Sequence, residues 1–198
     1  MAGELQLGGS TVATHTGSGA SAVVTIDNGV KFPTGMVLQT VALSNNNIWG
    51  YNITTSFTTI HSSGDYLYLP ITPKRSDSTL LLNWSINFNN SSATSFIYHF
   101  RLHDVTNDTN PDLGDAGNAG SRQVVNLSRR FNTFDANSTD QIQLTSLVSA
   151  SNTNARTYRI EGRTESGNRT LFINHSSSNN NTYGAAMVSY AYAMEIGA

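Results

Sequence analysis

The stretch AMVSYAYAMEI, Ala186–Ile196, alternates large apolar side chains with small ones. Because successive side chains of a β-strand point to opposite faces, the large residues share one face and the small ones share the other. The large face takes Val188, Tyr190, Tyr192, Met194 and Ile196, and the small face takes Met187, Ser189, Ala191 and Ala193. A strand this apolar would invite aggregation as a free edge. We therefore expect a second sheet or a trimer axis to cover it.

A second stretch, TYRIEGRTESGNRTLFINHS, contains two alternating runs separated by the turn residues Glu165–Asn168. This pattern predicts a β-hairpin. Tyr158 and Ile160 would share its buried face, and the Arg/Glu stripe that starts at Arg159 would face water. That stripe, Arg159, Glu161 and Arg163, is a candidate partner surface.

Short apolar runs between turn residues recur along the whole chain. They predict strands near 36–43, 53–60, 66–71, 79–88, 95–103, 122–127, 140–148, 156–164, 169–175 and 185–196. No window of a dozen residues has a 3.6-residue period, so we expect little helix. Many short strands with Gly- and Asn-rich connectors predict an all-β fold, an antiparallel β-sandwich with jelly-roll connectivity.

The chain of 198 residues is long enough for one β-domain and an arm. Residues 1–35 differ from the rest because Thr16–Ser21 is rich in Gly and Ser, which predicts a flexible arm with at most one or two strands. Such an arm lays its apolar residues on a neighbouring chain or on the parent domain. The candidate anchoring residues are Leu5, Leu7, Val23, Val24 and Ile26, and residues 36–198 form the expected sandwich.

The charge of the chain excludes several classes of partner. A net charge of −2 offers no basic footprint for nucleic acid. Its two basic pairs, Lys74–Arg75 and Arg129–Arg130, are isolated and are expected in solvated turns. The N-terminus has no basic n-region with an apolar run, and no window approaches the length needed to cross a bilayer, so we expect neither a secretory signal nor a membrane span. The absence of Cys excludes disulfides and thiolate chemistry.

No residue pattern indicates catalysis, and we expect a protein without cofactor or enzymatic activity. His99 and His103 share a strand face with Arg101, but the two His residues are about 13 Å apart along the backbone, too far to share one zinc without a third element. The loop Asp108–Asp115 lacks the Gly and Glu that an EF-type calcium loop requires at its sixth and twelfth positions. A calcium site of another type, near Asp108, Asn110 and Asp112, stays open.

Trp49 and Tyr51 suggest a second class of function. Exposed aromatic rings stack on sugars, and neighbouring Asn side chains bond to hydroxyl groups, so this stretch could form part of a carbohydrate-binding module. The alternative is a loop anchored by a half-buried Trp49.

Three segments resemble one family. The leader Gly3–Gly9 with Val24–Gly35 resembles the opening of small virion proteins of tailed phages, especially those of marine and cyanobacterial viruses. The middle segment Leu69–Leu82, LPITPKRSDSTLLL, is similar to a signature that joins two strands in the same group. The ending, a Tyr-rich strand running into Met194–Ile196, is similar to its C-terminus.

The resemblance implies a structural protein on the surface of a virus particle. It would be a capsid decoration or knob protein, or a component of a tail or head fibre, made in the host cytoplasm. The expected partners are itself, as a homotrimer, other virion proteins, and a host-surface glycan. The resemblance assigns no binding residue here, and the segment Lys74–Ser78 departs from the family because it is more charged.

Overall fold

The computed structural model describes residues 3–7, 10–16, 23–26, 33–60, 67–90, 96–111, 113, 124–131, 137–178 and 186–198. The chain divides into two compact units, Met1–Met36 and Val37–Ala198. This division falls next to the boundary expected after residue 35. The described residues form strands and turns without a helix, and so none forms a helix that could span a membrane.

The first unit contains an antiparallel sheet of three strands. They are β1 (Gly3–Leu7), β2 (Ser10–Thr16) and β3 (Val23–Ile26). The expectation of at most two strands is wrong, because both β1 and β3 pair with β2. Leu5 lies opposite Ala13 on β2, and Ala13 lies opposite Ile26 on β3. Leu5 is exposed, and the anchoring role of these apolar residues stays a prediction.

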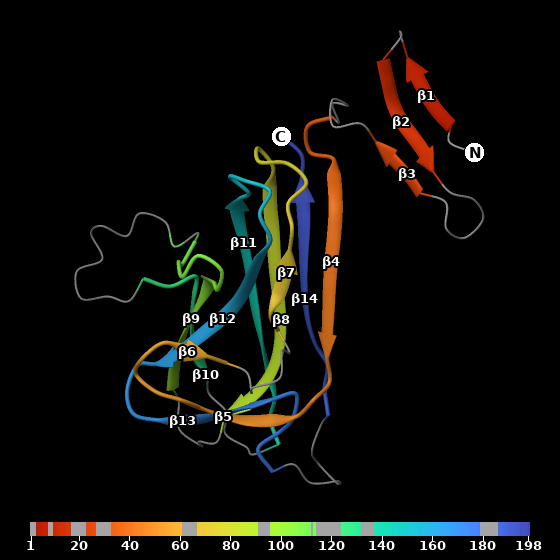
Figure 1. Cartoon of the computed structure of the whole chain (residues 1–198). Helices are drawn as coiled ribbons and strands as arrows, with labels where there is room; N and C mark the ends of the chain where they lie inside the picture. Colours follow the sequence, from red (N-terminus) through yellow and green to blue (C-terminus); the bar gives the residue numbers. More distant parts are fainter. Residues whose placement is uncertain are drawn as a thin grey trace. The chain divides into compact units, whose positions relative to one another are not determined.

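The second unit contains two sheets, of which the first is a six-stranded antiparallel sheet (Figure 1). Its strands are β4 (Val37–Asn45), β14 (Ser189–Ile196), β8 (Thr79–Asn90), β13 (Arg169–Ile173), β5 (Trp49–Ile53) and β11 (Asp140–Ser149). Strand β8 organises the sheet, because one of its edges pairs with β11 and the other pairs first with β14 and then with β13.

A second antiparallel sheet has five strands. They are β10 (Leu127–Phe131), β9 (Phe96–Asp104), β12 (Arg156–Thr164), β6 (Thr58–Thr59) and β7 (Leu69–Ile71). Strand β12 pairs with β9 along one edge and with β6 and β7 along the other. Both sheets contribute every second residue to one apolar core.

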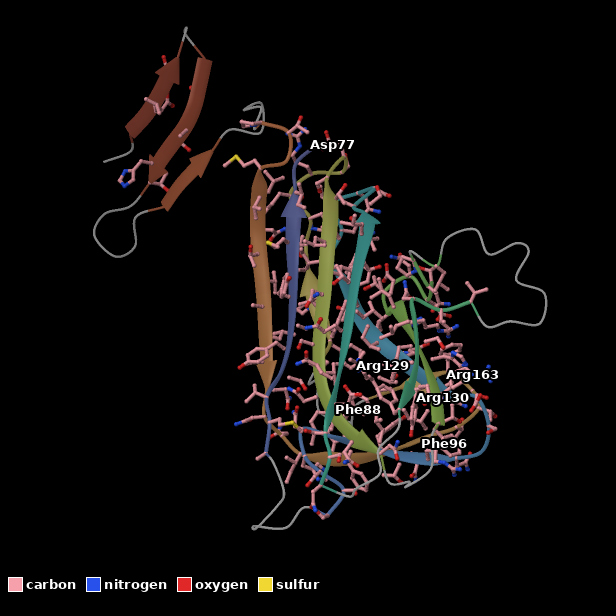
Figure 2. All side chains as sticks on the ribbon, turned by 180° about the vertical axis from the view of Figure 1, so that it is seen from behind. Asp77, Phe88, Phe96, Arg129, Arg130 and Arg163 are labelled. Carbon is pink, nitrogen blue, oxygen red and sulfur yellow. The ribbon has the colours of Figure 1, made fainter. Side chains whose placement is uncertain are left out.

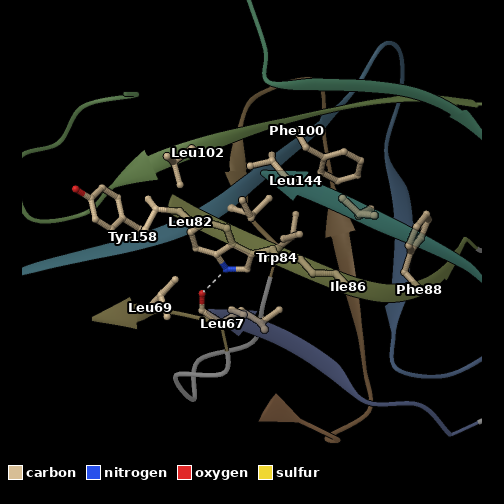
Figure 3. Close-up of a cluster of buried hydrophobic side chains, with 14 of the residues drawn as sticks. Leu67, Leu69, Leu82, Trp84, Ile86, Phe88, Phe100, Leu102, Leu144 and Tyr158 are labelled. Atoms are coloured by element: carbon tan, nitrogen blue, oxygen red, sulfur yellow. Dashed lines mark hydrogen bonds between the residues drawn. The ribbon is translucent and has the colours of Figure 1, made fainter. Parts of the chain in front are cut away.

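Trp84 on β8 lies fully buried in this core. Its indole Nε1 donates a hydrogen bond of 3.1 Å to the carbonyl of Leu67, so the one polar atom of the ring is satisfied (Figure 3). Phe100 and Leu102 of β9 and Tyr158 of β12 are buried from the facing sheet. The predicted all-β antiparallel sandwich is therefore confirmed, whereas jelly-roll connectivity stays a prediction.

Strand β14 is interior to its sheet, between β4 and β8, as its apolar sequence requires. The small residues point inward, with Ala191 and Ala193 buried. The large residues point outward, and Tyr190 is 53% exposed. Small side chains inside allow the bulky residues of the facing sheet to approach.

The predicted hairpin around Glu165–Asn168 is wrong. Its first arm is β12, in the five-stranded sheet, and its second arm is β13, in the six-stranded sheet. The turn is a corner between sheets, in which Gly167 adopts a φ of +65°. Alternation determines which side chains face the core, but it does not determine the partner strand.

Two expected strands are displaced. The strand expected at 53–60 is instead β5, which starts at Trp49, followed by the two-residue β6, because Trp49, Tyr51 and Ile53 pack on the core. The strand expected at 122–127 runs over Leu127–Phe131, where Phe131 is buried. Arg129–Arg130 therefore lies in a strand and not in a turn.

Candidate functional site

Strands β4, β14, β8 and β11 lie side by side and present one outer face (Figure 1). Directly opposed residues of antiparallel strands share a face, so the register defines its members. We call this set the uncharged face: Val37, Thr40, Ala42, Ser44, Tyr190, Tyr192, Met194, Ile196, Thr79, Leu81, Asn83, Ser85, Gln143, Thr145, Leu147 and Ser149. All of its members are described residues, and none is Asp, Glu, Lys, Arg or His.

An apolar row crosses the middle of the uncharged face. Leu147 lies opposite Leu81, which lies opposite Met194. Leu147 is 58% exposed, and two further residues of the face, Tyr190 on β14 and Val37 on β4, are also exposed. Exposed large apolar residues gathered on one face are typical of an interaction surface.

Polar side chains on this side of the sheet bond to one another. Asn83 Nδ2 donates to Thr145 Oγ1 at 2.7 Å, and Gln143 Nε2 donates to the Oε1 of Gln141, its neighbour on β11, at 3.0 Å. Gln141 Nε2 in turn donates to Asn87 Oδ1 at 3.2 Å. A face whose amides already have partners loses less free energy when water is removed. The chemistry of this face therefore suits burial against another protein surface.

A carboxylate clamp fixes one end of β14. Glu195 is fully buried, and its carboxylate accepts hydrogen bonds from the backbone amides of Lys74 and Arg75, from Ser78 Oγ and from Gln39 Nε2. Burial alone would raise the pKa of Glu195, but these hydrogen bonds hold it below its ordinary value. The clamp joins the turn Lys74–Ser78 to the C-terminal strand β14.

The extra charges of the middle segment pair with each other in the same turn. Arg75 donates from Nε and Nη2 to the two carboxylate oxygens of Asp77, at 2.8 and 2.7 Å. Both side chains are at the surface.

The Arg/Glu stripe of β12 is not the solvated face that alternation predicts. Glu161 is 5% exposed and accepts hydrogen bonds from Arg101 at 2.7 and 2.9 Å and from Arg159 at 2.7 Å. Burial alone would raise the pKa of Glu161, but the hydrogen bonds from Arg159 and Arg101 lower it. The β9 side chains on the same face shield the carboxylate, which the sequence of β12 alone could not reveal.

Trp49 and Tyr51 lie on β5 with their rings partly buried against the core. The structure therefore places them in a strand, and the loop reading is wrong. Packing on the core leaves less of each ring for stacking on a sugar, and a role in glycan contact stays a prediction.

The predicted polar face of β9 is formed as expected, with His99 opposite Arg163 and His103 opposite Arg159. The described residues contain no group of three His, Cys, Asp or Glu side chains able to share a metal ion. In the candidate calcium loop, Asn110 Oδ1 lies 3.2 Å from His103 Nδ1. Asp112 lies outside the described residues.

No protein-family model matches this chain, and no curated protein matches it. Two solved structures of infectious bursal disease virus are similar in outline. A chain of the Gt strain is 11% identical over 92% of this chain, with a TM-score of 0.35, and one of the Gx strain is 12% identical over 96%, with a TM-score of 0.33. The matches cover 42% and 46% of those chains. Similarity this low does not establish a common fold or function.

Proposed function

We propose that this chain is a non-enzymatic structural protein of a virus particle, in which copies associate through the uncharged face. The observation that carries the proposal is the uncharged face. Its members on four strands include no charged residue, and Leu147, Tyr190 and Val37 are exposed on it. Such a surface can meet a second copy without opposing like charges.

The assembly we propose is a homotrimer. Each copy in a closed trimer contacts two neighbours through different parts of its surface. In this proposal β4 and β14 of the uncharged face contact one neighbour, and β8 and β11 contact the other. Burial of the exposed apolar residues would supply the free energy of association.

The place of the protein in the particle rests on the sequence resemblance. In this proposal the first unit docks on other virion proteins of a tailed phage, and the sandwich projects outward as a capsid decoration or knob or as part of a fibre. The compact division at Met36 is compatible with one unit for docking and another for display.

Cryo-electron microscopy of the purified particle tests this proposal. Density for the sandwich on the outside of the shell or on a tail appendage is the expected result. Absence of the chain from purified particles, established by mass spectrometry, would overturn the virion assignment. Release of sugars from polysaccharides by the purified protein would overturn the non-enzymatic assignment.

A further inference from the structure

The outer face of the five-stranded sheet has the opposite character to the uncharged face. Strand alternation and register place Arg101, Arg130, Arg159 and Arg163 on it, four of the 11 Lys and Arg residues of the chain. Figure 2 shows Arg130 and Arg163 on this sheet. Arginines concentrated on one face of a chain with net charge −2 form a candidate site for an anion.

Carboxylates neutralise only part of the positive charge on this face. Glu161 is the acidic residue among the described strand positions there, and it is shared by Arg101 and Arg159. Asp108 and Glu165 lie in the turns at the ends of β9 and β12, and Asp108 approaches His103 at 3.6 Å. Among the described residues, Arg163 has no carboxylate within ion-pair distance, and its Nε donates to the carbonyl of Thr164 at 3.3 Å. The terminal nitrogens of Arg163 are thus candidate donors for an external anion.

The ring of Phe57 contacts two of these arginines, Arg101 and Arg163. The guanidinium carbon of Arg101 lies 4.1 Å from the centroid of the Phe57 ring, and that of Arg163 lies 5.7 Å from the same centroid. Stacking on an aromatic face holds a guanidinium group in place while its edge remains able to donate hydrogen bonds. Phe57 therefore brings two cations, Arg101 and Arg163, to one place, and of the two only Arg101 is paired with the Glu161 carboxylate.

His99 completes the cluster beside Arg163. The two residues are opposed in the register of β9 and β12. His99 Nδ1 is buried without a hydrogen-bond partner among the described residues. Burial and the nearby charge of Arg163 lower the pKa of His99, so the ring is neutral near pH 7.

We propose that Arg163 and Arg101 bind the anionic group of an acidic polysaccharide, either a carboxylate or a sulfate ester. The planar guanidinium fork matches both groups. Arg159 and Arg163 lie four residues apart on β12, about 13 Å along the strand. Charges at this spacing suit a polymer with anionic groups one or two sugars apart better than DNA, whose charges recur about every 1.7 Å of helix axis. This site lies on the other sheet from the uncharged face and does not depend on the proposed assembly.

Binding of the full chain to three polymers tests the site. Dextran sulfate and polygalacturonate supply the sulfate and the carboxylate, and unsubstituted dextran is the neutral reference. The wild-type chain should bind at least one of the two anionic polymers and not dextran, and added NaCl should weaken the binding. Absence of binding to both anionic polymers, or equal binding to dextran, would overturn the proposal. Tighter binding to an oligonucleotide or to anionic lipid vesicles would overturn the choice of polysaccharide.

Two variants locate the site. Arg163→Gln removes a half-buried charge that makes no ion pair among the described residues, so the fold should persist, and binding should weaken about tenfold or more. Lys74→Gln makes the same change of charge in the exposed turn before β8 and should leave binding unchanged. Equal binding by wild type and Arg163→Gln, or an equal loss in the two variants, would contradict the assignment. Thermal unfolding of both variants verifies that they are folded.

Discussion

The hydroxyl of Ser78 donates a hydrogen bond of 2.6 Å to the carboxylate of Glu195, a residue 117 positions further along the chain. Ser78 directly precedes β8, and Glu195 is the penultimate residue of β14. These two strands form the centre of the uncharged face. The clamp therefore helps to fix their register, and with it the positions of Leu81 and Met194.

Replacement of Glu195 should destabilise the sandwich. In Glu195→Gln the side chain keeps its size but loses the charge that accepts hydrogen bonds from two backbone amides and two side chains. We expect the free energy of unfolding in urea to fall by about 2–3 kcal/mol. Ser78→Ala removes one of these donors and should cost about 1 kcal/mol. A loss in Glu195→Gln no larger than that in Ser78→Ala would contradict the clamp.

The same carboxylate should make stability depend on pH. The pKa of Glu195 in the folded chain is lowered from its ordinary value of 4.5, so the unfolded chain binds a proton more readily. The stabilisation is fully present above the ordinary pKa and is lost as pH falls through the folded pKa. Urea unfolding between about pH 6 and pH 3 should show a steeper loss for wild type than for Glu195→Gln. Parallel curves would show that Glu195 does not titrate in this way.

Gly162 is a second sensitive position. A Cβ atom there would lie 2.7 Å from Cγ2 of Ile60 and 3.2 Å from the Phe100 ring. Because both neighbours are buried, Gly162→Ala should destabilise the sandwich by about 1–3 kcal/mol. Gly50→Ala is the control, since Gly50 is exposed and its nearest neighbours are 3.2 Å away. Urea unfolding should show the larger loss for Gly162→Ala, and equal losses would contradict close packing at β12.

Most strands could be predicted from the sequence, because apolar and polar residues alternate where one face of a strand is buried. The strand at 156–164 is predicted in full, and the one at 140–148 within one residue, since apolar residues recur at alternate positions in both. The segment around Trp49 was misplaced because Asn45–Asn47 and Gly50 resemble turn residues, although Trp49, Tyr51 and Ile53 alternate.

Strand partners could not be predicted in the same way. Alternation within Thr157–Ser176 is equally compatible with a hairpin and with a corner between sheets, and the second arrangement is found. The burial of Glu161 follows from Arg101, which the sequence places 60 residues away. The sequence of β14 predicts only that a second sheet or a trimer axis covers that strand, and the uncharged face depends on the register of four strands.

Removal of the first unit should abolish docking on the particle but leave the sandwich folded. A chain of residues 37–198 retains both sheets of the sandwich. We expect it to unfold cooperatively in urea and to be missing from particles assembled with it in place of the full chain. Incorporation of the shortened chain into particles would contradict a docking role for Leu5 and the other apolar residues of the first unit.

A charge on the uncharged face should block association without unfolding the chain. In Leu147→Lys an exposed residue on the β11 edge of that face gains a charge that would be buried between copies. Val105→Lys is the control, because Val105 is also exposed and apolar but follows β9 in the other sheet. Size-exclusion chromatography should show a smaller species only for Leu147→Lys. A smaller species in both variants, or in neither, would argue against this face.

Sedimentation equilibrium of the full-length wild-type chain tests the central claim most directly, because it gives the mass of the assembly without reference to its shape. We predict three times the chain mass of 21.3 kDa. A single species at 21.3 kDa across the concentration range would contradict association through the uncharged face.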